Sequence, residues 1–175
     1  YMALAKEGKY SEALDLIREQ NILPGICGRI CTHPCEDQCR RNELDGAVSI
    51  RSVKRFLADF PAETKPKNLK ISSAVENKKF AVVGSGPAGL AAAWELAKKG
   101  GQVTLFEKEK MIGGLLRYGI GPHRLPREIL DRELAFLKLF NVAFKTNSPV
   151  DLTDSGLKKL KKKYDSVIVT TGSWK

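Results

Sequence analysis

Cysteine, histidine and long apolar runs are all scarce in this sequence. The four cysteines lie between positions 27 and 39, and the rest of the 175 residues contain none. Neither histidine, His33 nor His123, has the serine, cysteine or aspartate arrangement of a hydrolase, and no catalytic acid–base pair stands out. No apolar run approaches the roughly 20 residues that a membrane-spanning helix needs. The sequence therefore predicts neither a hydrolase nor a membrane-spanning chain.

The opening residues, YMALAKEGKY, lack the charged and then apolar order of a secretory signal peptide. They are typical of an amphipathic helix, and Tyr1 is not a natural start, so we expect the chain to begin within a longer protein. A nucleotide-binding motif without a secretory signal predicts a reducing, cytoplasmic location.

The net charge of +10 raises the possibility of nucleic-acid binding, but its distribution argues against that partner. Residues 1–60 hold nine Lys/Arg and nine Asp/Glu, so the cysteine region is neutral. The run KKLKKK at 158–163 supplies five lysines, while Leu157, Leu160 and Tyr164 keep helical spacing. These lysines are therefore expected on the solvated face of a surface helix; the alternative is a basic patch for an acidic partner protein.

The pattern of apolar residues differs between the first and the second part of the chain. Residues 2–20, with Ser11 as the expected N-cap, and residues 47–60 have helical periodicity. Residues 61–77 contain two prolines and no period, which predicts a linker. From Lys78 the pattern becomes strand, glycine turn, helix, strand, and later a helix near 127–140 and a strand within 165–172. The predicted fold class is α/β, with a helical cysteine-rich domain (1–60), a linker (61–77) and part of a Rossmann-like domain (78–175).

The stretch from Gly84 to Gly89, GSGPAG, matches the GxGxxG fingerprint in its required context. An apolar strand precedes it, an Ala-rich helix follows, and Glu107 ends the next strand. Gly84 allows the tight turn, Gly86 lets the backbone approach a pyrophosphate, and Gly89 lets the helix pack on the strand. The helix N-terminus adds about half a positive charge. The motif predicts a dinucleotide site.

Glu107 narrows the choice of dinucleotide. A carboxylate there can accept hydrogen bonds from both ribose hydroxyls and would repel a 2′-phosphate, which favours FAD or NAD over NADP. Gly113 and Gly114 follow six residues later and permit a second close backbone approach to a long ligand. This second glycine pair favours FAD.

The cysteines Cys27, Cys31, Cys35 and Cys39 recur at every fourth position, and Pro34 interrupts any helix through them. We expect a loop folded around a bound group. Disulfides are the first alternative, but they are rare in a reducing cytosol. Zinc is the second, although it favours CxxC pairs separated by a longer loop. An iron–sulfur cluster held by thiolates is the leading interpretation, with His33 beside the ligands and not among them.

The order of motifs is similar to a known family. The segments ICGRICTHPCEDQCRR, VSIRSVKRF, VVGSGPAGLAAAWELAKKG, FEKEKMIGGLLRYGI and RLPREILDREL together resemble the small (beta) subunit of bacterial glutamate synthase. The same module forms the N-terminal part of dihydropyrimidine dehydrogenase and related NAD(P)H-linked flavoproteins. The resemblance covers essentially the whole chain.

The resemblance implies a function and a set of site residues. In that family NAD(P)H reduces FAD, and electrons pass through two [4Fe–4S] clusters to a partner subunit or domain. The resemblance therefore implies that the four cysteines are cluster ligands. It implies the following FAD-binding residues: Gly84, Gly86, Pro87, Ala88, Gly89, Glu107, Lys108, Gly114, Leu115, Leu116, Thr171 and Gly172.

The chain departs from the family pattern in two places. The family's upstream cysteine group and its NAD(P)H-binding fold are both missing from these 175 residues. We therefore expect a piece of an electron-transfer oxidoreductase, in which four thiolates stand where two clusters need about eight ligands. Two alternatives remain: a noncatalytic cluster- and flavin-binding adaptor of a larger complex, or a zinc-stabilised nucleotide-binding protein.

Overall fold

The structure, a computed structural model, describes residues 1–60 and 69–173. The chain divides into two compact units. Unit 1 comprises Tyr1–Leu69 and Pro122–Ile129, and unit 2 comprises Lys70–Gly121 and Leu130–Lys175. No helix in the described ranges is both long enough and apolar enough to cross a membrane.

Unit 1 is built from short helices. Its elements are α1 (Met2–Lys6), α2 (Tyr10–Arg18), α3 (Pro24–Ile30), α4 (Pro34–Asp37), the 3₁₀ helix η1 (Arg40–Glu43) and α5 (Ile50–Asp59). The core of the unit is apolar and includes Ala13, Ile17 and Leu57, with Val53 packed against it. These residues recur at helical spacing in α2 and α5, so their burial explains why both segments are helical.

Residues 2–20 are helical as predicted, but they form two helices, and the expected N-cap at Ser11 is wrong. Gly8 adopts a positive φ of 75° and separates α1 from α2. The N-cap of α2 is Lys9, so Ser11 lies inside the helix and not at its start. A glycine in the left-handed region ends α1 because the helix cannot continue through that conformation.

Close packing of α3 on α5 depends on Gly28. A β-carbon at Gly28 would lie 2.8 Å from Cβ of Arg55, so the helices can approach this closely only at glycine. A charged pair fixes the same contact. The guanidinium of Arg29 donates to both carboxylate oxygens of Asp59, at 3.0 and 2.9 Å, and to the Gly25 carbonyl at 3.0 Å.

Unit 2 contains a parallel four-stranded sheet with the strand order β3-β2-β1-β4. Its elements are β1 (Lys79–Val83), α6 (Pro87–Lys98), β2 (Gln102–Phe106), α7 (Leu115–Tyr118), α8 (Arg127–Leu137, of which Leu130 onward lies in unit 2), β3 (Val142–Lys145), α9 (Asp154–Lys161) and β4 (Ser166–Val169). The βαβ unit and the strand within 165–172 are confirmed. Strand β3 was not predicted.

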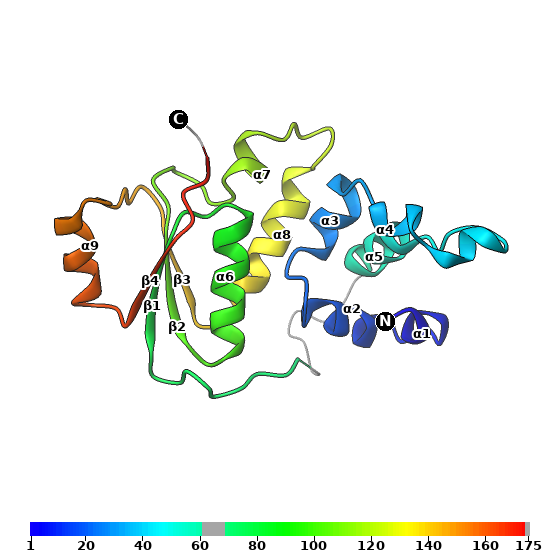
Figure 1. Cartoon of the computed structure of the whole chain (residues 1–175), viewed down its shortest axis with the longest axis horizontal. Coiled ribbons are helices and arrows are strands. Elements are labelled where there is room, and N and C mark those ends of the chain that lie inside the picture. The colour runs from blue at the N-terminus through cyan, green and yellow to red at the C-terminus, as the bar shows by residue number, and fades with distance from the viewer. Residues whose placement is uncertain (61–68, 174–175) are drawn as a thin grey trace. The chain divides into compact units, whose positions relative to one another are not determined.

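Figure 1 shows α6 against one face of this sheet and α9 on the opposite side. Apolar side chains fill the space beneath α6, including Val82 of β1 and Leu105 of β2, both with no exposed surface. The indole of Trp94 on α6 packs on Phe136 and Phe140, with ring centroids 5.4 and 4.9 Å apart. This layered arrangement holds the strand ends, and therefore the glycine turn, in fixed positions.

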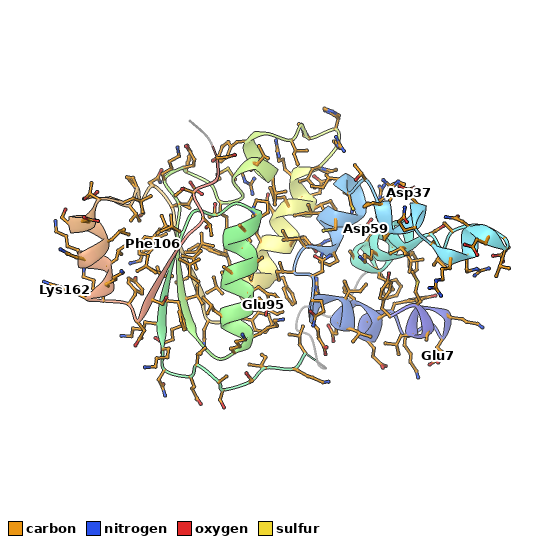
Figure 2. All side chains as sticks on the ribbon, in the orientation of Figure 1. Glu7, Asp37, Asp59, Glu95, Phe106 and Lys162 are labelled. Atoms are coloured by element: carbon orange, nitrogen blue, oxygen red, sulfur yellow. The ribbon has the colours of Figure 1, made fainter. Side chains whose placement is uncertain are left out.

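Helix α9 carries the lysine run as expected. Thr153 caps it by accepting a hydrogen bond from the Gly156 amide at 3.4 Å. Leu157 and Leu160 are half-buried, whereas the five lysines of 158–163 are exposed. Figure 2 labels Lys162 at the end of this helix. The solvated-face interpretation of the run is confirmed.

Residues 61–68 of the predicted linker (61–77) lie outside the described residues. The part from Leu69 onward runs along the end of α6. The Ser72 amide donates to the Lys98 carbonyl at 2.8 Å, and the Val75 amide donates to the Lys99 carbonyl at 3.0 Å. These residues are therefore joined to unit 2 by backbone hydrogen bonds before β1 begins.

Candidate functional site

The glycine turn lies at the carboxyl end of β1, where ligands bind in parallel α/β sheets. Gly84 has a φ of 103°, which side chains rarely allow, and a β-carbon there would overlap the carbonyl oxygen of Thr170. A β-carbon at Gly89 would overlap the carbonyl oxygen of Gly84. These two glycines are therefore required by the fold itself.

Gly86 differs from these two glycines. Its φ of −69° and ψ of −179° suit any residue, and no atom lies within 4 Å of the place where its β-carbon would be. Neither backbone strain nor internal packing explains a glycine here, whereas close approach of a ligand does. Gly86 is also the N-cap of α6, and no side chain caps that helix. The open space therefore faces uncapped N–H groups suited to a phosphate.

Glu107 sits just beyond β2 and is buried, with only 6% of its surface exposed. Its Oε2 accepts hydrogen bonds from the amide of Ser85, at 3.1 Å, and from the Ser85 hydroxyl. Its Oε1 accepts the Glu109 amide at 3.0 Å. Each oxygen has two lone pairs, and the three donors fix the carboxylate beside the glycine turn.

Electrostatics keep this carboxylate ionised. Burial alone would raise the pKa of Glu107, but hydrogen bonds from the Ser85 hydroxyl and from the Glu109 and Ser85 amides outweigh burial and hold its pKa below the usual value. The site therefore presents a fixed negative acceptor at neutral pH.

The second glycine pair adjoins the first turn. The Gly113 amide donates to the Ser85 hydroxyl at 2.9 Å. Gly114 has a φ of 48°, and a β-carbon on it would lie 2.7 Å from the Cα of Gly86. Two glycine segments that are 28 residues apart in sequence thus meet at one place, which is the arrangement that an extended dinucleotide requires.

The other residues expected at the dinucleotide site have different surroundings. Pro87 and Ala88 are exposed at the start of α6, and Lys108 is exposed and lies 3.8 Å from the Glu109 carboxylate. Leu115 is 48% exposed, but Leu116 is only 4% exposed and points into the protein interior. Thr171 and Gly172 are both exposed just beyond β4.

Sequence reasoning missed Thr170. Its hydroxyl lies 2.9 Å from the Val83 carbonyl and 3.0 Å from the Gly84 carbonyl and donates to both. Its amide also donates to Val83, at 2.8 Å. The residue immediately after β4 therefore supports the glycine turn from beneath. The available signal was the TTG that follows the strand, of which the sequence prediction named only Thr171 and Gly172.

The cysteines occupy short helices and their ends, so the expected loop is wrong in detail. Cys27 lies in α3, Cys31 at its C-cap, Cys35 in α4 and Cys39 before η1. All four are free thiols, and Cys31 and Cys35 are exposed. Within residues 1–60 and 69–173, no three Cys, His, Asp or Glu side chains are close enough together to hold a metal ion. The donor chemistry suits a cluster, but the geometry is not that of a complete site.

Helix α5 supports the cysteine segment. The Arg51 guanidinium donates to the Cys31 carbonyl at 3.1 Å, and the Arg51 amide donates to the Glu36 carboxylate at 2.7 Å. The His33 amide donates to the Cys31 sulfur at 3.3 Å. Burial raises the pKa of Tyr1, and its electrostatic interactions with Cys35 and Glu36 raise that pKa further. The segment is thus held by α5 and lies beside the first residue.

A cavity of about 600 Å³ opens elsewhere on unit 2. Its lining includes Lys79 and Gln102, the first residues of β1 and β2, together with Asn141, Lys163 and Tyr164. It therefore lies at the amino ends of the strands, opposite the glycine turn. We do not assign the dinucleotide to it, because such ligands bind at the carboxyl ends.

Two protein families match separate parts of the chain. Residues 1–66 match the family described as dihydropyrimidine dehydrogenase domain II, 4Fe-4S cluster. Residues 82–134 match the family described as NAD(P)-binding Rossmann-like domain. The second match includes the glycine turn, Glu107 and the Gly113–Gly114 pair.

Curated relatives match nearly the whole chain. The beta subunit of the NADP(+)-dependent formate dehydrogenase of Moorella thermoacetica is 36% identical over 98% of this chain and 27% of its own length. The beta subunit of the NADPH-Fe(3+) oxidoreductase of Geobacter sulfurreducens is 37% identical over 99% and 26%. The glutamate synthase [NADPH] small chain of Bacillus subtilis is 38% identical over 98% and 35%. The chain thus spans about a quarter to a third of these relatives' lengths.

Proposed function

We propose that the chain belongs to the family of the glutamate synthase small subunit and the dihydropyrimidine dehydrogenase N-terminal module, and that it is part of an electron-transfer oxidoreductase. In the whole protein, NAD(P)H would reduce FAD, and electrons would leave through [4Fe–4S] clusters. The part of the enzyme described here would hold FAD and contribute cluster ligands.

The single observation that carries the proposal is the open space at Gly86. A glycine that neither strain nor packing requires faces an uncapped helix N-terminus, and a fixed carboxylate lies on the next strand. FAD fits this arrangement, because its pyrophosphate can meet the N–H groups at the start of α6 and its adenosine ribose can meet Glu107. Gly114, directly beside Gly86, would let the rest of the ligand pass.

The residues proposed to contact FAD have separate tasks. Gly86, Pro87 and Ala88 leave the pyrophosphate space open, while Gly84 and Gly89 shape the turn beneath it. Lys108, Leu115, Thr171 and Gly172 are exposed, so their side chains or backbone are available to a ligand. Leu116 would act from the interior by holding α7 in place, since its side chain is buried.

For the cysteines, we propose that the thiolates of Cys27, Cys31, Cys35 and Cys39 belong to the ligand set of a [4Fe–4S] cluster in the whole protein. The free thiols, their neutral surroundings and the match of residues 1–66 to a 4Fe-4S family support this assignment. Because this segment does not gather three ligands, we derive no step through a cluster within this chain.

The same proposal implies a partner subunit and a cellular location. Several relatives are named as beta subunits or small chains, so we propose a larger electron-accepting subunit for this protein as well. We propose a cytoplasmic location because nicotinamide nucleotides and four free thiols both suit a reducing compartment.

An absorption spectrum of the anaerobically purified chain tests the proposal, with iron, zinc and sulfide assayed on the same sample. Flavin bands that appear on incubation with FAD and remain after gel filtration would support the FAD site, and G86A should lose them. A wild-type chain that retains no flavin, even at high FAD concentration, would contradict the proposed function.

The same assays separate the two alternatives. Stoichiometric zinc without iron or sulfide would favour a zinc-stabilised nucleotide-binding protein. A bound flavin that NAD(P)H cannot reduce in the full-length protein would favour a noncatalytic adaptor.

A further inference from the structure

The hydroxyl of Ser85 joins three segments of unit 2. Ser85 has no exposed surface and lies inside the glycine turn. Its oxygen lies within hydrogen-bond distance of Glu107 Oε2 and 2.9 Å from the Gly113 amide nitrogen. The turn after β1, the residue after β2 and the second glycine pair therefore meet at one buried oxygen atom.

The direction of each hydrogen bond follows from the chemistry of the partners. An ionised carboxylate can only accept, so the Ser85 O–H must donate to Glu107. The Gly113 N–H can only donate, so it occupies a lone pair of the same hydroxyl. The Ser85 hydroxyl thus donates one hydrogen bond to Glu107 and accepts one from the Gly113 amide at the same time. Alanine can make neither hydrogen bond.

Ser85 also determines which way Glu107 faces. Both the amide and the hydroxyl of Ser85 donate to Oε2, while the Glu109 amide donates to Oε1. Two of the three hydrogen bonds to the carboxylate thus come from one residue. Oε2 thus accepts two hydrogen bonds and Oε1 accepts one, so the lone pair left on Oε1 is held in a fixed direction before a ligand binds.

We propose that Ser85 is a positioning residue that aims the free lone pair of Glu107 Oε1 at the ribose 2′-hydroxyl of an adenine dinucleotide and fixes Gly113 beside it. This inference rests on the proposed FAD site and adds a determinant of ribose recognition to it. Ser85 does not contact the ligand: it acts through Glu107, so its effect should be largest with ligands that carry the ribose 2′-hydroxyl.

ADP and 2′-deoxy-ADP test this inference, since both carry the adenosine diphosphate half of FAD and differ in one hydroxyl. Their affinities for the 175-residue chain are measured by displacement of FAD, in wild type, S85A, S85C and E107Q. S85A should raise the Kd of ADP by about three- to tenfold, which is the effect of losing one hydrogen bond. The Kd of 2′-deoxy-ADP should change much less. The preference for ADP over 2′-deoxy-ADP should therefore shrink.

S85C and two further variants, S85A/E107Q and S166A, sharpen the result. S85C has nearly the size of serine and keeps a weaker donor, so it should restore part of the preference. S85A/E107Q should bind ADP no more weakly than E107Q alone, because coupled residues give non-additive effects. S166A is the matched control: it removes a serine hydroxyl from an exposed position at the far end of β4 and should change neither affinity.

The outcomes distinguish the inference from the proposed function. Equal weakening of ADP and 2′-deoxy-ADP by both S85A and S85C would assign Ser85 a purely structural role and overturn the inference. A preference that E107Q abolishes but S85A retains would overturn it too, while leaving the FAD site intact. A wild-type chain that binds neither FAD nor ADP would overturn the proposed function itself.

Discussion

The carbonyl oxygen of Gly84 lies directly against the Cα of Gly89, so that a β-carbon on Gly89 would overlap it. Only three residues away from Gly89, the corresponding position at Gly86 faces open space. The three glycines of one fingerprint therefore have different reasons to be glycine. Two maintain the turn, and one leaves room for a ligand.

This difference predicts opposite results for two alanine substitutions. G89A should lower the free energy of unfolding by about 3 kcal/mol, because its methyl group meets backbone that cannot move aside. G86A should change that free energy by no more than about 0.5 kcal/mol, since its φ and ψ suit alanine and no neighbour is close. FAD affinity should nevertheless fall by about tenfold or more in G86A.

Urea unfolding and FAD titration of the two variants provide the measurement. If G86A is as unstable as G89A, the open space at Gly86 is not a feature of the folded protein. If G86A is stable and binds FAD as wild type does, the pyrophosphate does not pass Gly86.

Thr170 gives a second prediction, about the support beneath the turn. T170V removes a hydroxyl that donates to the carbonyls of Val83 and Gly84 while keeping the size of the side chain. The free energy of unfolding should fall by about 1–2 kcal/mol, because both carbonyls lose a donor. T171V makes the same change one residue later at an exposed position, and its stability in urea should match wild type. Equal losses in both variants would contradict the assigned role of Thr170.

Part of the dinucleotide site in unit 2 could be predicted from the sequence, and part of it could not. The fingerprint, its strand and helix, and Glu107 were predictable, because the spacing of the glycines between a strand and a helix is specific to a dinucleotide-binding turn. Ser85 and Thr170 were not, since a serine inside GxGxxG and a threonine after a strand are common. Their importance comes from three strand ends meeting in space, which depends on the strand order β3-β2-β1-β4.

In unit 1, less of the local structure could be predicted from the sequence. The cysteine spacing was visible, but spacing alone could not show that α3 would carry Cys27, or that α5 would hold the segment through Arg51. The helix break at Gly8 was also missed, because apolar periodicity continues on both sides of it. Apolar periodicity predicts the buried face of a helix more reliably than the residues at which the helix ends.

The pKa of Glu107 predicts how stability depends on pH. The native pKa lies below the unfolded value of about 4.3, so the ionised carboxylate stabilises the folded state above that pH. As pH falls from that value through the native pKa, this contribution is lost. The difference in unfolding free energy between wild type and E107Q should therefore be constant from pH 7 to about 5 and decrease at lower pH.

Urea unfolding of both proteins at each pH gives that difference directly. Other acidic groups titrate in the same range, but they are common to both proteins and cancel. A difference that stays constant down to pH 3 would mean that the native pKa of Glu107 is not set by these hydrogen bonds.

The Arg29–Asp59 pair gives a last prediction, for the unit that carries the cysteines. Arg29 is 9% exposed in its side chain and donates to both oxygens of Asp59, joining α3 to α5. D59A leaves this guanidinium buried with only the Gly25 carbonyl from among these partners, so we expect a loss of about 2 kcal/mol in unfolding free energy. D45A removes the carboxylate of the exposed Arg41–Asp45 pair and should cost less than about 1 kcal/mol. Urea unfolding monitored by circular dichroism compares the two, and equal effects would mean that burial of Arg29 adds nothing to the pair. Because α3 carries Cys27 and ends at Cys31, D59A should also increase the rate at which these thiols react with a thiol reagent, while D45A should not.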